Sequence, residues 1–269
     1  MMRWLLTLVG LSLSTATANP LFEPSKLELL VPAYFYPGTD DLHWPALNAA
    51  AGKVPLTVIM NPASGPGEKA DPAYVEAVAK VRAAGATVIG YVHISYGKRP
   101  MKQVQADVEL YRNLYEIDGI FLDEMASDST PKSVSYQSQL ISQIKADSPD
   151  WTVVGNPGVM PDAVHLGEQG ADIVVSFEDT AAQWLLARDG DLRSIKGPRS
   201  SPLLAGASLA QLVHTTTDEQ LVHQIVSTAA MGGIKALYIT NDKMDNPWDT
   251  LPVWWTTLVD HIAAINSGA

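Results

Sequence analysis

The chain has 269 residues, of which 46% are hydrophobic and 17% are charged, and it contains no cysteine. This composition supports one large buried core, excludes an intrinsically disordered protein, whose charged share would be higher, and excludes disulfides, thiol nucleophiles and cysteine-based metal sites. The 18 Lys and Arg residues against 29 Asp and Glu give a formal net charge of −11, which argues against a nucleic-acid partner because such a protein must neutralise phosphates.

The N-terminus predicts an export signal. Arg3 provides a short positive start, residues 4–13 are apolar, and Ala16-Thr17-Ala18 fits a small-residue cleavage site. The apolar run is roughly half of the about 20 residues needed to span a bilayer, which disfavours a membrane anchor. We therefore expect a signal peptide over residues 1–18 and one mature domain over residues 19–269, secreted or periplasmic and free of the membrane after cleavage.

Eight apolar runs then predict eight strands. They lie at residues 26–36, 55–61, 87–94, 119–122, 152–155, 173–177, 209–213 and 236–240. The runs are continuously apolar rather than alternating, as is typical of parallel strands that are covered on both faces.

Helical patterns separate most of these strands. They lie at residues 71–82, 104–115, 134–144, 218–231 and 251–265. We expect Asp71 to cap the first of these helices with Pro72 at its first position. Trp254 and Trp255 are expected to pack against the core from inside the last helix.

This order predicts an α/β fold, a (β/α)8 TIM barrel in a single domain. The alternative is an open doubly wound sheet. That fold normally carries a glycine-rich phosphate-binding turn after its first strand, where this chain has Tyr34-Phe35-Tyr36-Pro37-Gly38.

The predicted strands all end in residues that can form hydrogen bonds or titrate. These are Tyr34 and Tyr36, Asn61, His93 with Ser95 and Tyr96, Asp123 and Glu124, Asn156, Glu178 and Asp179, His214, and Asn241 with Asp242. A single Asp or Asn after a strand is usually a helix cap, but Tyr, His and Glu are poor caps. Because the C-terminal ends of barrel strands surround the active site, the set as a whole predicts a functional site there.

Two of these ends carry carboxylates directly after apolar strand residues, at Asp123-Glu124 and at Glu178. Burial at the edge of a core raises a carboxyl pKa. Neighbouring residues on a strand face opposite sides, so Asp123 and Glu124 both face the barrel only if the strand bends. Two acids on separate strands that face one cavity are the arrangement of glycoside hydrolases; the alternative is that both are structural ion-pair partners.

Aromatic residues near the same rim favour a sugar ligand. Tyr34, Tyr36, Tyr96 and Trp248 offer flat faces for the C–H faces of sugar rings; the alternative is that they fill the barrel mouth. An alternative is a metal site formed by His93 and His214 with Asp123 and Asp242. Scattered single histidines at strand ends, however, more often bind substrate or orient a carboxylate. We expect no metal and no cofactor.

Six segments of the chain resemble the spherulin-4-like family. They are LVPAYFYP (30–37), VIMNPASGPG (58–67), VIGYVH (88–93), DGIFLDEM (118–125), VGNPG (154–158) and DNPWD (245–249). The resemblance covers nearly all of the mature chain and implies a (β/α)8 barrel with glycoside hydrolase activity. Characterised members are endo-acting on α-1,4-linked N-acetylgalactosamine runs of galactosaminogalactan-type exopolysaccharides, the polymers of biofilm matrices.

The resemblance also implies roles for individual residues. The family's acidic residues fall on Asp123 as nucleophile or transition-state stabiliser, Glu178 as general acid/base, and Glu124 in support. The residues expected to bind substrate are Tyr34, Tyr36, Asn61, His93, Tyr96, Asn156, His214, Asp242 and Trp248. Residues 190–207 fit the family poorly and are expected to form a loop that shapes one wall of the groove.

Two other functions remain open at this point. One is a non-catalytic glycan-binding protein of a matrix or cell wall, and the other is a metal-dependent polysaccharide deacetylase. In each case the expected partner is a polysaccharide, and the protein is expected to be a monomer.

Overall fold

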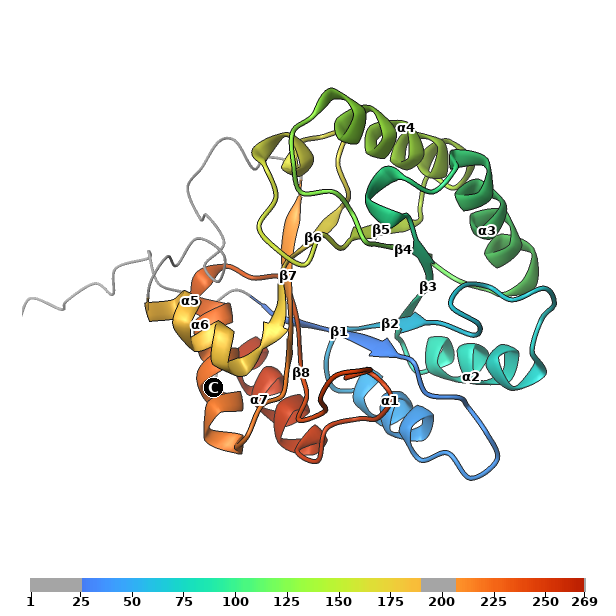
Figure 1. Ribbon diagram of the computed structural model, residues 1–269. Helices are drawn as coiled ribbons and strands as arrows, with labels where there is room; N and C mark the ends of the chain where they lie inside the picture. The colour runs from blue at the N-terminus through green and yellow to red at the C-terminus, as the bar shows by residue number, and fades with distance from the viewer. Residues whose placement is uncertain (1–25, 190–206, 269) are drawn as a thin grey trace, which may run out of the picture.

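A computed structural model describes residues 26–189 and 207–268 and forms a closed barrel of eight parallel strands (Figure 1). The strands are β1 (Glu28–Ala33), β2 (Leu56–Met60), β3 (Thr87–His93), β4 (Gly119–Asp123), β5 (Thr152–Gly155), β6 (Ile173–Thr180), β7 (Ser208–His214) and β8 (Ala236–Ile239). Each strand pairs with the next along the chain, and β8 closes the ring on β1 through Glu28 opposite Ala236 and Leu29 opposite Leu237. The predicted (β/α)8 barrel is confirmed, and the open doubly wound sheet is excluded.

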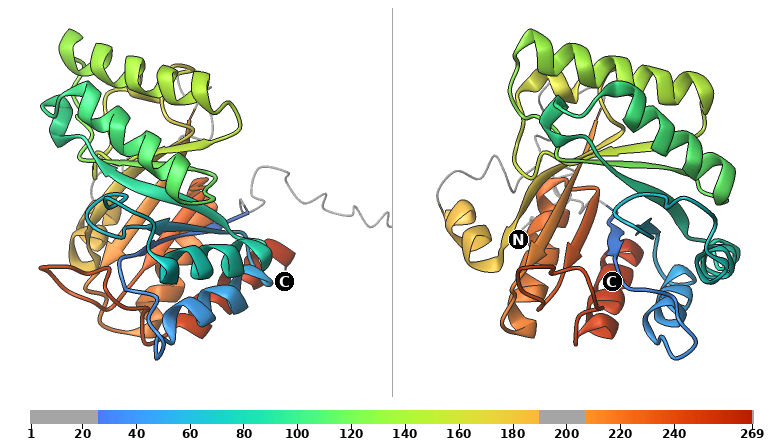
Figure 2. Two further views of the ribbon diagram at one scale, coloured as in Figure 1. Left: turned by 90° about the vertical axis from the view of Figure 1, so that its right-hand side faces the viewer. Right: turned by 45° about the vertical axis from the view of Figure 1, so that its right-hand side comes forward.

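Seven α-helices of the described residues lie outside this ring (Figures 1 and 2). They are α1 (His43–Ala51), α2 (Pro72–Ala83), α3 (Met101–Leu114), α4 (Pro131–Asp147), α5 (Ala181–Asp189), α6 (Glu219–Gly232) and α7 (Trp255–Ser267). Short 3₁₀ turns, η2 (Ser95–Gly97) and η3 (Ala163–Leu166), follow β3 and β5. None of the helices in the described ranges is long and apolar enough to cross a membrane.

The predicted start of α2 is confirmed, because the Asp71 side chain accepts a hydrogen bond from the Ala73 amide with Pro72 at the first helical position. The start of α7 differs from the prediction. The helix begins at Trp255 rather than Leu251, since Pro252 and a turn precede it. Trp254 and Trp255 are half-buried and pack against the core as predicted, but Trp254 precedes the helix instead of lying inside it.

The helices α1 and α5 are not predicted from the sequence. Both have nine residues, too few for a clear helical repeat. The start of α1 is fixed by Asp41, whose carboxylate accepts hydrogen bonds from the backbone amides of His43 (3.1 Å) and Trp44 (2.8 Å).

Close contact between the strands and helices depends on glycine at one position of β3. A Cβ atom at Gly90 would lie 2.7 Å from the ring of Tyr111 on α3. The absence of that atom allows the buried Tyr111 ring to lie directly on the strand and its hydroxyl to donate to the Met60 carbonyl at 3.3 Å. Contacts of this kind fix the strands against their helices, and so fix the strand ends where the polar residues lie. The predicted signal peptide and residues 190–206 of the predicted groove-wall loop lie outside the described residues.

Candidate active site

Asp123 is the last residue of β4 and lies beside Tyr91 of the neighbouring strand β3. The Tyr91 hydroxyl donates a hydrogen bond of 2.8 Å to Asp123 Oδ2. Tyr91 also stacks on Phe121, which precedes Asp123 by two residues, with ring centroids 6.2 Å apart. Because side chains alternate along a strand, Phe121 and Asp123 project to the same side, into the barrel.

Asn156, directly after β5, joins the two predicted catalytic acids. Its side-chain nitrogen Nδ2 donates to Asp123 Oδ1 at 2.8 Å and to Glu178 Oε2 at 2.5 Å. Its side-chain oxygen Oδ1 accepts from the Gly158 amide at 2.9 Å, which fixes the orientation of the carboxamide. Asn156 is 5% exposed, so the bridge between the acids is a buried one.

Glu178 reaches this bridge from β6, where the pairing with β7 slips by one residue between Val175 and Phe177. A bulge of this kind re-aims the side chains that follow it. Beyond it, the Glu178 amide donates to the Gly158 carbonyl at 2.8 Å. The same short turn therefore positions both the amide of Asn156 and the backbone of Glu178.

Both acids hold their protons more tightly than ordinary carboxyl groups do. Burial, together with the nearby charge of Asp123, raises the pKa of Glu178 to about 7 against the opposing hydrogen bonds from Asn156 and Trp248. Burial also raises the pKa of Asp123, while hydrogen bonds from Tyr91, the Glu124 backbone and Asn156 oppose the rise. The partners that restrain the two pKa values are all uncharged, which the ion-pair alternative does not predict.

Glu124 shows that the strand bends, as the sequence requires if both neighbouring acids are to approach the barrel mouth. Its φ angle is 56°, in the left-handed region, and its carbonyl accepts from the Tyr96 amide at 2.7 Å. Its charge contributes to the raised pKa of both Asp123 and Tyr91. Glu124 therefore lies near the pair of acids without being part of the Asn156 bridge.

Trp248 covers the pair from the loop between β8 and α7. It is 6% exposed, its ring contacts His214 and Tyr238 at centroid distances of 5.9 Å, and its carbonyl accepts from the Tyr34 amide. The Trp248 side chain also forms a hydrogen bond to Glu178.

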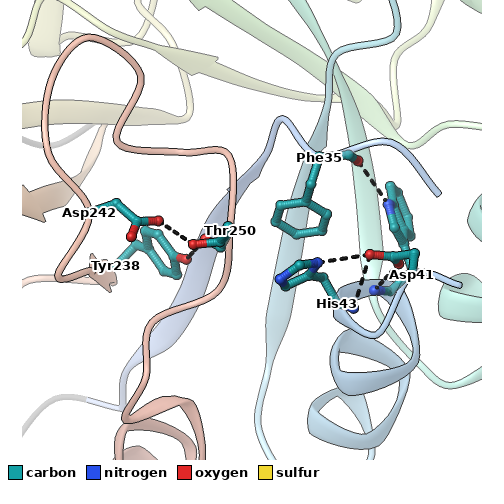
Figure 3. A network of polar contacts seen from close by, with 7 residues as sticks. Phe35, Asp41, His43, Tyr238, Asp242 and Thr250 are labelled. Atoms are coloured by element: carbon teal, nitrogen blue, oxygen red, sulfur yellow. Dashed lines mark hydrogen bonds and ion pairs between the residues drawn. The ribbon is translucent and has the colours of Figure 1, made fainter. Parts of the chain in front are cut away.

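The loop that carries Trp248 is closed by Asp242. Figure 3 shows the Asp242 carboxylate accepting from the Thr250 hydroxyl, and the Tyr238 hydroxyl near the Thr250 carbonyl. In the same view, Asp41 binds His43, whose ring faces Phe35, at the start of α1. These contacts tie down the loops that follow β8 and β1, which are neighbouring strands.

Tyr34, directly after β1, lies against the same centre. Its ring meets that of Tyr91 edge-on at 5.6 Å. Burial and the nearby charges of Asp123 and Glu178 raise its pKa well above the ordinary tyrosine value. The predicted site residues that the structure brings together are thus Asp123, Glu178, Glu124, Asn156, Tyr34, Trp248 and, through Trp248, His214 and Asp242.

Four other predicted site residues lie at the rim, outside the Asn156 bridge, and three of them make contacts of their own. Tyr36 is 57% exposed and its hydroxyl donates to Asp71 at 3.3 Å. Tyr96 is 56% exposed, with Lys98 over its ring. The Asn61 carboxamide accepts from the Gly65 amide at 2.9 Å within its own turn.

His93 is the fourth. It ends β3 opposite Asp123 in the strand register and is half-buried.

Tyr91 belongs to the site but is not among the residues predicted from the sequence. It lies inside an apolar strand, where a tyrosine is usually a core residue. One signal was available: Tyr91 precedes His93 by two residues, so both face the same side of the strand.

No group of three or more His, Asp or Glu side chains that could hold a metal occurs within residues 26–189 and 207–268.

Comparisons with known proteins identify the family of the chain. The model of the spherulation-specific family 4 matches residues 28–262. Spherulin-4 of Physarum polycephalum is 33% identical over 250 residues, which cover 88% of this chain and 70% of that protein.

Among the solved structures that share the fold, two are similar in different degrees. The structure of Aspergillus clavatus Sph3 in complex with GalNAc has a TM-score of 0.76 and 27% identity, covering 90% of this chain and 99% of that one. The catalytic domain of a hyperthermophilic chitinase from Pyrococcus furiosus has a TM-score of 0.52 and 12% identity, covering 93% and 98%, and is similar in fold alone. The match of the family model over most of the barrel, together with the spherulin-4 relative, shows that this chain belongs to the spherulation-specific family 4.

Proposed function

We propose that this protein is an endo-acting glycoside hydrolase that cleaves a polysaccharide containing α-1,4-linked N-acetylgalactosamine or galactosamine, with Glu178 as general acid/base and Asp123 as nucleophile. The observation that carries the proposal is the pair of buried acids that share the Asn156 amide at the barrel mouth. One member of the pair has a pKa near neutrality, as a general acid requires.

The spacing of the acids supports a mechanism with retention. One oxygen of each acid contacts the same nitrogen, at 2.8 and 2.5 Å, so these two oxygens lie no more than about 5.3 Å apart. Retaining enzymes hold their carboxyl groups about 5–5.5 Å apart, whereas inverting enzymes need about 6.5–9.5 Å to admit a water molecule.

The reaction then has two balanced steps. Asp123 bonds to the anomeric carbon while protonated Glu178 gives its proton to the glycosidic oxygen, so that the carbon–oxygen bond breaks and the departing chain leaves with a new hydroxyl. Water then bonds to the anomeric carbon, its proton passes to Glu178, and Asp123 leaves as a carboxylate. Tyr91 and Asn156 hold Asp123 in place, and Glu124 supports it.

The substrate class rests on the comparison with the Aspergillus clavatus protein, whose structure holds GalNAc. The half-buried Tyr34 beside the acids offers aromatic surface for a sugar ring, and the buried Trp248 supports the site from behind. We further propose that the predicted signal peptide directs the protein to the periplasm or the medium and that it acts as a monomer.

Release of reducing ends from galactosaminogalactan tests the proposal. We expect activity in the wild type and its loss in Asp123→Asn and Glu178→Gln. Asp150→Asn and Glu168→Gln, exposed acids that precede β5 and β6, are matched controls and keep activity. Polysaccharide binding without cleavage would indicate the glycan-binding alternative, and acetate release that a chelator abolishes would indicate the deacetylase.

A further inference from the structure

Two histidines face each other on the outside of the barrel, on helices that the catalytic account does not use. His223 of α6 and His261 of α7 have ring centroids 4.4 Å apart, and their Nδ1 atoms are in direct contact. The helices α6 and α7 follow different strands but pack side by side (Figure 1). The contact between the rings is therefore a contact between two segments 38 residues apart in the chain.

A third side chain orients one ring of the pair. The Ser227 hydroxyl lies 3.4 Å from His261 Nε2, one turn along α6 from His223. When His261 Nε2–H donates to Ser227, its Nδ1 carries a lone pair that is directed at His223. Metal-binding histidines are oriented in this way, since the second ring nitrogen donates to a neighbouring group and fixes the tautomer.

Each of the two histidines has an acidic residue near it on its own helix. Glu219 lies one turn before His223 and accepts a hydrogen bond from Thr257. Asp260, next to His261, forms an ion pair of 3.0 Å with Lys53.

We propose that His223 and His261 form a binding site for a divalent late transition-metal ion of the zinc class, with both Nδ1 atoms as ligands and water at the remaining positions. Imidazole suits zinc, copper and nickel, at a metal–nitrogen distance of about 2.0–2.1 Å for zinc. The rings separate slightly from their present contact to admit the ion. With two protein ligands, the site binds an exchangeable ion that bridges α6 and α7.

Calorimetric titration of the tag-free, full mature chain with Zn²⁺ at pH 7.5 tests this proposal. We expect one Zn²⁺ per chain and at least a tenfold loss of affinity in both His223→Gln and His261→Gln. Ser227→Ala, which removes only the orienting hydroxyl, weakens binding by about tenfold. His43→Gln, a change in a histidine paired with Asp41 elsewhere on the surface, keeps wild-type affinity.

Absence of Zn²⁺ binding in the wild type would overturn the proposal, and so would equal affinity in the wild type and His223→Gln. His223 is exposed, so this variant is expected to fold, which its circular dichroism spectrum verifies. The readout is independent of glycosidase activity, so the site and the proposed function succeed or fail separately.

Discussion

The two ends of the barrel use acidic residues in opposite ways, and β4 and β6 each show both. Asp118 precedes β4 and pairs with Arg82 at 2.7 Å, and Asp172 precedes β6 and pairs with Lys145 at 2.6 Å. At the other ends of these strands, Asp123 and Glu178 contact the uncharged Asn156 instead. The acids at the first end form salt bridges, whereas a buried acid with neutral partners and a second acid nearby gains proton affinity.

Under the proposed function, acids before a strand stabilise the fold, and acids at the end of a strand take part in catalysis. The largest effect should come from exchanging carboxyl for amide at the two ends. We expect Asp123→Asn and Glu178→Gln to lower kcat/KM on the order of 10³-fold or more, with the melting temperature kept or raised. Asp118→Asn and Asp172→Asn should leave kcat/KM near the wild-type value. Similar losses of activity at both ends would contradict the distinction.

Asn156 should give the next largest effect, because both acids depend on its amide. We expect Asn156→Ala to lower kcat by about 10²-fold. Its hydrogen bonds favour the charged form of each acid, so removing them raises both pKa values. Both limbs of the pH–rate profile should therefore move to higher pH. A drop in kcat with an unmoved profile would mean that Asn156 acts on structure alone.

The loop that carries Trp248 should have a smaller influence. Thr250→Val keeps the shape of the side chain but removes the hydroxyl that Asp242 binds. We expect kcat to fall roughly tenfold or less as Trp248 loses its fixed position over Glu178. Thr256→Val, at an exposed position nearby, is the matched control. Equal kinetics in the two variants would show that the contact between Asp242 and Thr250 does not affect catalysis.

The smallest expected effect is the loss of stability when the ion pair of Asp118, at the start of β4, is removed. Asp118→Asn loses the ion pair with Arg82 but keeps an oxygen for the Val88 amide. Because the pair is partly exposed, we expect a loss of about 1 kcal/mol in the free energy of unfolding. Thermal unfolding should show this as a decrease of roughly 2–4 °C. An unchanged melting temperature would show that the pair contributes nothing measurable.

The sequence predicts the barrel well because buried parallel strands have continuous apolar runs, and the eight runs match the eight strands to within a few residues. The short helices α1 and α5 are not predicted, since nine residues give little periodicity. The Asp41 side chain, two residues before α1, binds the first amides of that helix and is a sequence signal for its start.

The site is predicted in part, for a similar reason. Strand ends can be located from sequence, so Asp123, Asn156 and Glu178 could be expected at one mouth. The bulge in β6 and the left-handed backbone of Glu124 depend on tertiary contacts, and they decide which acids meet. The exposed rim residues Tyr36 and Tyr96 also follow strand ends, but their side chains contact Asp71 and Lys98 rather than the acids.

The most direct test of the central claim is an NMR titration of the protein labelled with ¹³C at the glutamate carboxyl carbons. We expect one glutamate that titrates near pH 7. Its signal is missing in Glu178→Gln and titrates at lower pH in Asp123→Asn, where the neighbouring charge is gone. If every glutamate titrates in the ordinary range, near about pH 4.3, then Glu178 is ionised at neutral pH and the assignment of a general acid is wrong.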